Sequence, residues 1–445
     1  KAGSGEVTLR LVGAAGTVVE NFGVGSSVTI GENRVTFTPT SDLSAETLYH
    51  VSYPSGCFTN NEGTEYVGTA YTFKAVNTYS LSTWIAGGNN GEGVLGLNQA
   101  EGTVGSYSSP IQIPGTTWGY TFIGGGSASV ATKTDGTLWT WGRNYKSNLG
   151  QGSSDNNFRR SSPVQVGSAT DWADGKCTIM EYSGACIKTD GTLYTWGRNY
   201  YGALGTNSRS DANNPIQVPG TTWSNIESNS YRMIATKTDG TLWMWGRNQD
   251  GALGNGNSTT QRSSPTQIPG TTWATGRGKN GVLTNKALYA IRTDGTLWTW
   301  GSNEYGELGV NSRSDANSPV QVPGTTWAYG SSGGGSSPIF VKTDGTLWTW
   351  GYNSYGECGQ NNETAYSSPV QVGSGTDWKV STNNLSNRSG AIFALKTNGE
   401  LWGIGNNGSG GLGQNSTTQY SSPVQVSGYW DEIFYGDSCS GQSEQ

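Results

Sequence analysis

A unit of about fifty residues recurs along most of this chain, and it limits the possible folds more than any other feature of the sequence. The unit reads Lys-Thr-Asp-Gly-Thr-Leu-Trp-Thr-Trp-Gly-Arg-Asn, followed by Leu-Gly, by Ser-Pro-Val-Gln-Val and by a closing tryptophan. The proline recurs at Pro110, Pro163, Pro215, Pro265, Pro319, Pro369 and Pro423, and the closing tryptophan at Trp118, Trp172, Trp223, Trp273, Trp327, Trp378 and Trp430. Seven copies of one unit predict seven similar supersecondary structures that pack side by side.

Each copy has the pattern of a small antiparallel sheet. Asp-Gly or Asn-Gly stands between two apolar runs, as a two-residue β-turn prefers, and we expect the aspartate to act as a turn former that tolerates left-handed backbone. These turns begin at Asp135, Asp190, Asp239, Asp294, Asp344 and Asn398. The 69 glycines, 18 tryptophans and 22 tyrosines, with only 13% charged residues, also indicate short strands joined by many turns. The predicted fold class is therefore all-β.

The two ends of the repeat array are incomplete in a complementary way. The first copy starts late, at Thr83–Gly87, and the last stops early, after Trp430 and Ile433. A ring of blades that joins its first strands to its last leaves no open sheet edge, whereas a solenoid would show capped terminal repeats. We predict a seven-bladed β-propeller over residues 76–445, closed by pairing of the N- and C-terminal repeat halves.

The repeat accounts for all 18 tryptophans. They occupy the two aromatic positions of the Leu-Trp-Thr-Trp strand or the closing position. Aromatic faces can stack on sugars, but residues that recur with the scaffold are better explained as filling between blades. The structural interpretation is favoured, and ligand binding is the alternative.

The segment Gly3–Lys74 alternates between apolar and polar positions, which is typical of β-strands. The alternating segments are Val7–Leu11, Val28–Ile30, Val35–Phe37, Tyr49–Tyr53 and Tyr71–Phe73. The chain starts with Lys1, which suggests that its numbering begins inside a longer or processed product.

The residues that catalysis and cofactor binding require are scarce. The only histidine, His50, lies in a predicted strand outside the propeller, which excludes a catalytic triad on the repeats, and we expect it to face solvent. The turn aspartates do not form a pair for acid–base chemistry, and the glycine runs lack the lysine of a phosphate loop. We therefore expect no enzyme, no catalytic residue, no cofactor and no metal site.

Charge and hydropathy exclude two further classes of partner. The net charge of −6 and the absence of Lys/Arg clusters are untypical of nucleic-acid binders. No apolar run is long enough to cross a membrane, so we predict no membrane insertion, and no signal peptide is visible.

The five cysteines are scattered and show no metal-ligand spacing. Cys177 and Cys186 fall on neighbouring predicted strands of one blade, and whether they form a disulfide stays open. Cys358 replaces the leucine of Leu-Gly, so we expect it to be a small buried apolar residue.

Recognition is expected in loops where the copies differ, because the shared positions build the scaffold. The first two loops between Leu-Gly and the proline are the longest, and the second contains Phe158, Arg159 and Arg160. Four tyrosines that follow the Trp-Gly-x-Asn turns form either an aromatic rim or packing within their own loops: Tyr145, Tyr201, Tyr305 and Tyr355. The loop Asn-Ser-Arg-Ser-Asp-Ala-Asn occurs at both Asn207 and Asn311, which suggests recent duplication or several equivalent weak sites.

The pattern Trp-Gly-x-Asn, Gly-x-Leu-Gly, Ser-Pro-Val-Gln-Val, Trp and Lys-Thr-Asp-Gly over residues 79–445 resembles the repeat of the regulator of chromosome condensation family. That family forms seven-bladed propellers, and it includes a nucleotide exchange factor for a small GTPase and a bacterial protein inhibitor of β-lactamases. No exchange-factor catalytic residue can be matched to this chain, so the resemblance implies architecture alone.

The N-terminal segment resembles the Ig-like modules of bacterial surface-layer proteins in the run Val-Thr-Phe-Thr-Pro-Thr-Ser-Asp-Leu and in Tyr-His-Val-Ser-Tyr-Pro-Ser-Gly-Cys-Phe. Such modules begin with further strands, which either precede Lys1 or come from a neighbouring subunit; we favour the first. The resemblance implies an Ig-like β-sandwich module at residues 1–75, incomplete at its N-terminus.

The combination of the two parts is similar to virion structural proteins of marine tailed bacteriophages. This resemblance implies a protein of the virion surface (tail fibre, spike or decoration) that contacts other virion proteins through the Ig-like module and a host-surface glycan or protein through propeller loops. A secreted or cell-surface bacterial adhesin is the alternative. An intracellular regulator of a small GTPase fits less well with the acidic charge and the Ig-like neighbour.

Overall fold

The computed structural model of the chain divides into two compact units, Lys1–Ser80 and Leu81–Gln445. In the first unit the structure describes residues 6–11, 18–23, 28–30, 35–37, 47–52, 58 and 71–75. In the second it describes 84–85, 92–98, 111–113, 117–123, 128–434 and 440–444, with gaps at 156–157, 230, 276–278, 284–286, 332–335, 381–384, 389 and 409. The described residues form antiparallel sheets and two short 3₁₀ turns, so the all-β prediction is confirmed.

The first unit contains a four-stranded sheet in the order β2 (Val18–Gly23), β1 (Glu6–Leu11), β5 (Thr47–Ser52) and β6 (Tyr71–Ala75). A separate pair is formed by β3 (Val28–Ile30) and β4 (Val35–Phe37). Alternate residues of β1 are buried, as period-two alternation predicts. The alternation pattern does not predict β2. His50 lies on β5 opposite Arg10 and is half-buried, so the prediction that it faces solvent is only partly met.

Six four-stranded sheets of the second unit each correspond to one repeat, and we call them the first to sixth blades. The first three are β9–β12 (Trp118–Ile123, Ala128–Lys133, Leu138–Arg143, Arg159–Gln165), β13–β16 (Trp172–Ile179, Ser183–Lys188, Leu193–Gly197, Ala212–Gln217) and β17–β20 (Trp223–Asn229, Arg232–Lys237, Leu242–Gly246, Arg262–Ile268). The next three are β21–β24 (Asn280–Leu283, Ala287–Ile291, Leu297–Gly301, Ala316–Gln321), β25–β28 (Trp327–Ser331, Ile339–Lys342, Leu347–Gly351, Tyr366–Gln371) and β29–β32 (Leu385–Arg388, Ala391–Leu395, Leu401–Gly405, Tyr420–Val426). The 3₁₀ turns are η1 (Tyr145–Ser147) and η2 (Gln249–Gly251).

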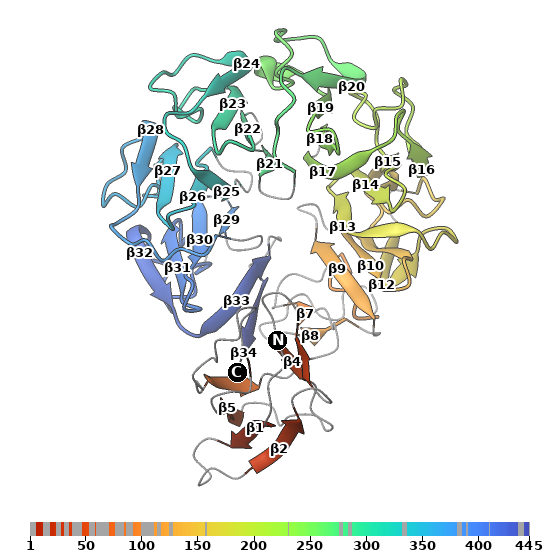
Figure 1. The fold of residues 1–445 in the computed structure, drawn as a ribbon. Helices are drawn as coiled ribbons and strands as arrows, with labels where there is room; N and C mark the ends of the chain where they lie inside the picture. Colours follow the sequence, from red (N-terminus) through yellow and green to blue (C-terminus); the bar gives the residue numbers. More distant parts are fainter. Residues whose placement is uncertain are drawn as a thin grey trace. The chain divides into compact units, whose positions relative to one another are not determined.

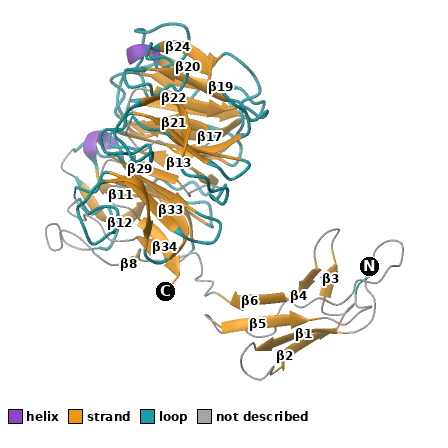
Figure 2. Ribbon diagram, turned by 90° about the vertical axis from the view of Figure 1, so that its left-hand side faces the viewer, coloured by secondary structure: helices purple, strands orange, loops and turns teal. Residues whose placement is uncertain are grey.

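The blades follow one another around a ring in the second unit, as Figure 1 shows. The first strand of each blade contacts the first strand of the next, from β9 through β13, β17, β21, β25 and β29 to β33 (Tyr429–Phe434). Each of the six blades is a simple meander of antiparallel strands. Figure 2 shows the ring of blades from the side. This arrangement is a β-propeller.

The remaining blade is assembled from the two ends of the repeat array. β33 pairs with β34 (Ser440–Glu444), β7 (Trp84–Ile85) pairs with β8 (Ile111–Gln112), and β34 contacts β7. The sequence predicted closure of this blade between Thr83–Gly87 and Trp430–Ile433, without a strand after Ile433. The structure corrects this detail, because β34 is a second C-terminal strand whose Ser-Gly-Gln-Ser-Glu sequence carries no apolar pattern.

Tryptophans tie neighbouring blades together at both ends of the strands. The indole N–H of Trp245 in the third blade donates to the Ala203 carbonyl in the Leu-Gly loop of the second blade, over 2.8 Å. The same bond is made by Trp141, Trp196, Trp300 and Trp350. At the opposite end, the backbone N–H of Trp223 donates to the Gly191 carbonyl in the turn of the preceding blade, and other closing tryptophans repeat this bond. These contacts support the structural interpretation of the tryptophans.

The Asp-Gly turns are held by a side-chain network. In the third blade, Asp239 Oδ1 accepts from the backbone N–H and the hydroxyl of Thr241, which in turn accepts from the Trp243 indole over 2.8 Å. Gly240 has a φ of +78°, whereas the aspartate has none of the left-handed character that was expected of it. The aspartate therefore acts by hydrogen bonding, and only the glycine takes the left-handed conformation.

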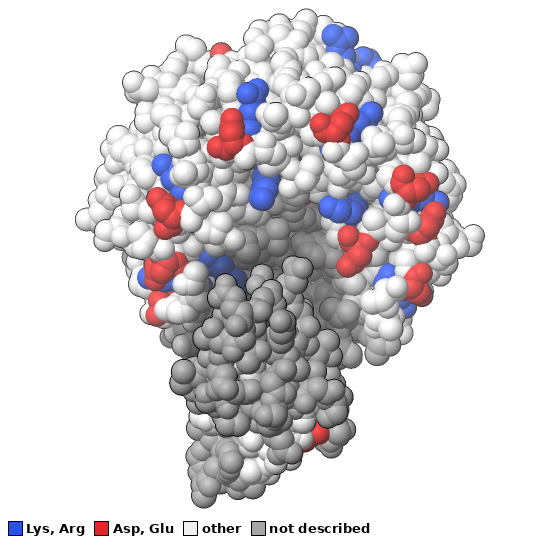
Figure 3. Space-filling view, viewed as in Figure 1, with Lys and Arg blue, Asp and Glu red and all other residues white. Residues whose placement is uncertain are grey.

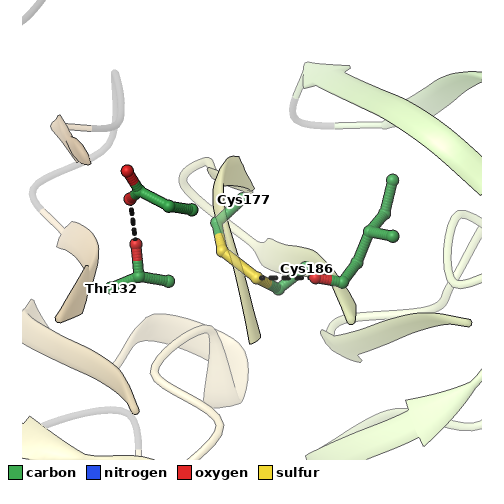
Figure 4. Close-up of a disulfide and its surroundings, with 5 residues drawn as sticks. Thr132, Cys177 and Cys186 are labelled. Carbon is green, nitrogen blue, oxygen red and sulfur yellow. Dashed lines mark hydrogen bonds between the residues drawn. A yellow bond between two sulfur atoms is a disulfide. The ribbon is translucent and has the colours of Figure 1, made fainter. Parts of the chain in front are cut away.

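Cys177 on β13 lies directly opposite Cys186 on β14, and the two form a disulfide (Figure 4). This answers the question that the spacing left open. In the same view, Thr132 of the first blade donates to Asp174 over 2.5 Å. Cys358 is a fully buried free thiol in the leucine position, as expected.

Candidate binding face

The propeller presents two ends, which differ in the loops they carry. Because successive strands run in opposite directions, the turn between strands one and two of a blade lies at the same end as the loop between strands three and four. We call this end the loop face. The opposite end, with the Asp-Gly turns and the loops before the closing tryptophans, is the turn face.

A buried asparagine organises each long loop of the loop face. In the second blade, Asn199 Nδ2 donates to the carbonyls of Ser208 and Ser210, and its Oδ1 accepts from the Leu204 N–H over 2.9 Å. Similar bonds are made by Asn144, Asn248, Asn303, Asn353 and Asn407. The asparagine of Trp-Gly-x-Asn is thus a loop organiser, and the residue before it is left to vary.

Tyrosines from three successive blades form a continuous chain across this face. Tyr145 of the first blade contacts Tyr182 of the second, with ring centroids 5.6 Å apart, and Tyr182 contacts Tyr231 of the third at 5.5 Å. Tyr231 meets the edge of Tyr201 at 5.4 Å, and Tyr201 meets Tyr200 at 4.8 Å. Tyr200 is 62% exposed, so the chain ends in an accessible ring.

An arginine accompanies the tyrosines in each of these blades. The guanidinium of Arg143 lies 5.0 Å from the Tyr145 ring, that of Arg198 lies 5.2 Å from Tyr182, and that of Arg247 lies 5.2 Å from Tyr201 and 5.3 Å from Tyr231. The next three blades have Ser302, Tyr352 and Asn406 at this position. We call Arg143, Tyr145, Tyr182, Arg198, Tyr200, Tyr201, Tyr231 and Arg247 the arginine–tyrosine cluster.

Arg232 adds a further positive charge beneath the cluster. It faces the glycine of Trp-Gly-Arg across the sheet, where the other complete blades have only Ala128, Ser183, Ala287, Ser337 and Ala391. Arg232 is 3% exposed and donates through Nε to the Arg247 carbonyl over 2.8 Å. Burial, and then the charge of Arg247, lower the pKa of Arg232 to about 10, while Asp250 acts against them. The guanidinium remains charged at neutral pH.

The opposite part of the loop face combines tyrosines with carboxylates. Tyr352 contacts Tyr305 at 5.0 Å and Tyr355 at 6.4 Å. Burial raises the pKa of Glu357 to about 7, although the Tyr355 N–H donates to its carboxylate over 2.9 Å. The negative charge of Glu304 raises the pKa of Tyr305. The loop face therefore differs in charge between its two parts.

The tyrosines expected to form a rim do not touch one another directly. Tyr145 and Tyr201 are joined only through Tyr182 and Tyr231, while Tyr305 and Tyr355 are joined through Tyr352. The rim is thus two separate clusters, each built between blades.

Phe158, Arg159 and Arg160, which were predicted as binding residues of a protruding loop, make contacts within the protein. Arg159 forms an ion pair with Glu92 over 2.5 Å, and Arg160 stacks on Phe158 at 4.0 Å. Phe158 in turn packs against the hydrophobic core between the first two blades. They border the arginine–tyrosine cluster, since Glu92 also lies 3.7 Å from Arg143.

The sequence interpretation missed Tyr182, Tyr231, Arg232 and the three arginines of Trp-Gly-Arg-Asn. A signal for them is present, because they depart from the other copies at equivalent positions. The signal appears when the seven copies are aligned and compared at each position. A single consensus sequence for the repeat hides it.

No other charged feature stands out. On the side of the second unit seen in Figure 3, acidic groups recur around the ring close to basic ones, and neither sign prevails. The described residues contain no group of three or more His, Cys, Asp or Glu that could hold a metal ion. No helix in the described part of the chain is long and apolar enough to cross a membrane.

Comparison with known proteins gives curated relatives that match parts of the chain. The ultraviolet-B receptor UVR8 of Arabidopsis thaliana is 29% identical over 44% of this chain and 44% of its own length. The mitochondrial RCC1 domain-containing protein RUG3 of Arabidopsis thaliana is 26% identical over 34% of each chain. Human E3 ubiquitin-protein ligase HERC2 is 23% identical over 63% of this chain, but the match covers only 6% of HERC2. The chain thus spans less than half the length of these relatives.

Solved structures show the same fold at low sequence identity. Human WBSCR16 has a TM-score of 0.65 at 18% identity, with 82% of this chain and 99% of that chain covered. Prp20p of Saccharomyces cerevisiae, whose structure was described with its binding to Gsp1p and histones, has a TM-score of 0.63 at 17% identity over 83% and 93%. Residues 82–442 match the RCC1-like domain, and the chain belongs to this family of β-propellers.

Proposed function

We propose that the propeller is a non-catalytic binding platform that holds an acidic partner against the arginine–tyrosine cluster of its loop face. The observation that carries this proposal is the stacking of three arginines on tyrosines of three successive blades, in a chain whose net charge is −6. No described carboxylate lies within ion-pair distance of Arg198 or Arg247. Their charges are available to a partner.

The geometry suits binding by a rigid surface. A guanidinium stacked on a tyrosine ring loses little further freedom when it binds, and its planar fork matches a carboxylate in a bidentate manner. Tyrosine and arginine are also the residue types that dominate the energetics of protein interfaces. The buried charge of Arg232 adds to the positive potential on the same side.

We further propose that the chain is a surface protein of a virion (tail fibre, spike or decoration). Its propeller would contact the host surface or other virion proteins, and its first unit would be an Ig-like module that joins it to the particle. The sequence resemblances support this setting, and the antiparallel sheets of the first unit agree with a module of this type. A bacterial adhesin is the alternative. An intracellular regulator of a small GTPase is supported only by the family resemblance of the propeller; Prp20p, which has a similar fold, is described with its binding to Gsp1p and histones.

The acidic partner can be tested with immobilised poly-L-glutamate as the probe. Arg198→Gln with Arg247→Gln is expected to reduce binding about 10-fold or more, because each charged hydrogen bond contributes about 1.5–3 kcal/mol before solvent screening. Arg209→Gln with Arg313→Gln is the matched control, since these exposed arginines lie on duplicated loops outside the cluster. If both double variants lost the same affinity for poly-L-glutamate, the binding would depend on overall charge and not on the cluster, and this would contradict the proposal.

The setting is tested separately. Mass spectrometry of purified particles is expected to find this chain at a fixed ratio to the major structural proteins. Finding it only in envelopes of uninfected cells would favour the adhesin.

A further inference from the structure

The turn face carries a repeated cation site that the loop-face proposal does not use. In each complete blade, a cation at the end of the second strand or directly after it lies over two aromatic rings, at 4.1–5.4 Å from their centroids. The two rings are the closing tryptophan and the first aromatic residue of the third strand. These cations are Lys133, Lys188, Lys237, Arg292, Lys342 and Lys396.

In two blades the protein itself supplies a carboxylate to this cation. Asp171, immediately before the closing tryptophan, lies 3.0 Å from Lys188 Nζ in the second blade. Asp377 lies 3.1 Å from Lys396 Nζ in the sixth blade. We call these the closed sites.

The other four complete blades have a threonine in the aspartate's place, Thr117 in the first, and this loop is described in full in the third to fifth blades. Thr222, Thr272 and Thr326 stand in the aspartate's place, in loops that read Pro-Gly-Thr-Thr-Trp and are one residue shorter than those of the closed sites. No ion pair joins Lys237, Arg292 or Lys342 to a described carboxylate. We call these the open sites. Burial lowers the pKa of Lys342, while the charge of Asp344 acts against this shift.

The open sites also contain buried donors without partners. The indole Nε1 atoms of Trp223, Trp273 and Trp327 make no hydrogen bond, although these side chains are 1–2% exposed. In the fourth blade Arg292 Nε is a second buried donor without a partner. The indole Nε1 atoms of the closed sites, Trp172 and Trp378, also make no hydrogen bond, so the partnerless indole is common to both kinds of site. Buried polar groups are almost always hydrogen-bonded, and Arg292 Nε is the exception that is particular to an open site.

Both kinds of donor converge on one glycine in each open site. A methyl group on Gly220 would lie 3.3 Å from Lys237 Nζ and 3.8 Å from Trp223 Nε1. On Gly270 it would lie 3.0 Å from an Arg292 terminal nitrogen and 3.3 Å from Trp273 Nε1. Gly324 repeats the arrangement with Lys342 at 3.4 Å and Trp327 at 3.8 Å. These glycines and the threonines that follow them are exposed, so the sites open to the surface.

The sixth blade shows which chemical group fits there. A methyl group on Gly375 would lie 3.1 Å from Asp377 Oδ1 and 3.5 Å from Trp378 Nε1. In this closed site the carboxylate contacts Lys396 through Oδ2 over 3.1 Å, while the Trp378 indole makes no hydrogen bond. The threonines of two open sites, Thr222 and Thr326, have a φ of +67°, which is unusual for β-branched residues and typical of strain at functional positions.

We propose that the three open sites each bind a carboxylate side chain of an acidic protein segment, in the place that the protein's own aspartates fill in the closed sites. An aspartate on a protein loop is the group seen to occupy this place, which favours a protein partner over an acidic polysaccharide. The open sites lie in three successive blades, so a segment with several acidic residues can engage more than one of them and gain by multivalency.

The test observes the indole N–H groups by NMR in the ¹⁵N-tryptophan-labelled chain, with a hexa-aspartate peptide as the probe. The expected result is a saturable shift of the Trp223, Trp273 and Trp327 indole signals and none for Trp172 and Trp378, whose cations are already paired. Lys237→Gln should abolish the shift of Trp223 alone, and Lys237→Arg should restore it, which guards against loss of fold. Lys188→Gln should leave all three shifts unchanged.

Equal shifts at open and closed sites, or no shift at millimolar peptide, would overturn the proposal. Tighter binding of a galacturonate oligomer than of the peptide at equal charge would overturn the assignment to a protein segment. The Arg198→Gln, Arg247→Gln variant should show the same three shifts as the unchanged chain, because its substitutions lie at the other end of the blades.

Discussion

The bond from Trp245 to the preceding blade allows a quantitative test of how the ring is held together. Trp245 is completely buried, and its indole N–H donates to the Ala203 carbonyl over 2.8 Å. Trp245→Phe leaves this buried acceptor without its donor, which costs about 1–3 kcal/mol. The smaller ring also leaves a void, for which about 1–2 kcal/mol is reasonable. We therefore expect Trp245→Phe to lower the free energy of unfolding by about 2–5 kcal/mol.

Trp243→Phe is the matched control on the same strand. Trp243 is only partly buried, and its indole donates to the Thr241 hydroxyl, which can bond to water instead. Its loss should cost about 0.5–1.5 kcal/mol. Both variants are measured by urea unfolding followed by far-UV circular dichroism, with an unchanged m-value as the condition for comparison. If the two variants lost stability to within about 0.5 kcal/mol of each other, the indole–carbonyl bond would not be what holds neighbouring blades together.

Further predictions concern the glycines, the turns and the disulfide. Gly205→Ala should lower the free energy of unfolding by more than about 3 kcal/mol, because the added methyl group would lie 2.6 Å from the indole of the next blade. Gly167 has a similar φ and nothing within 4 Å, so Gly167→Ala should cost only about 1–2 kcal/mol of backbone strain. Equal losses of stability in urea unfolding would show that the contact with the indole is unimportant. The threonine hydrogen bonds lower the pKa of Asp239, so its contribution to stability is present above the unfolded pKa of about 3.9 and is lost as the pH falls through the folded value. Asp239→Asn should therefore lose less stability than the unchanged chain between pH 7 and pH 3, and an identical loss would contradict the assignment. Reduction of the Cys177–Cys186 disulfide should cost about 2–3 kcal/mol, and unfolding that is insensitive to dithiothreitol would be evidence against the bond.

The propeller could be predicted from the sequence because short patterns specify its strands and turns, and these patterns recur in every repeat. The Asp-Gly turn, the apolar alternation and the closing tryptophan recur at fixed offsets, and each offset corresponds to one strand or turn of a blade. The structural role of the tryptophans follows from the same repetition. The closing strand β34 escaped prediction, because Ser-Gly-Gln-Ser-Glu has no strand pattern and its position depends on β33 and β7.

The candidate sites could be predicted only in part. Tyr145 and Tyr201 were recognised as loop residues, but their connection through Tyr182 and Tyr231 joins residues from three blades. Arg159 was expected at a protruding loop, yet Glu92 of a different repeat holds it in an ion pair. Contacts of this kind join residues far apart in the chain, and the distances along the sequence do not reveal them.

The amino-acid sequence is sufficient to specify the blade, because hydrogen bonding and packing within a blade use neighbouring strands and the same residues in every copy. Folding of the ring then brings different copies together, so that residues in which the copies differ meet across neighbouring blades. It joins tyrosines of three successive blades into one chain and places Arg247 on Tyr201 of the preceding blade. The scaffold is therefore encoded in what the copies share, whereas the binding surfaces depend on where the ring places the residues in which they differ.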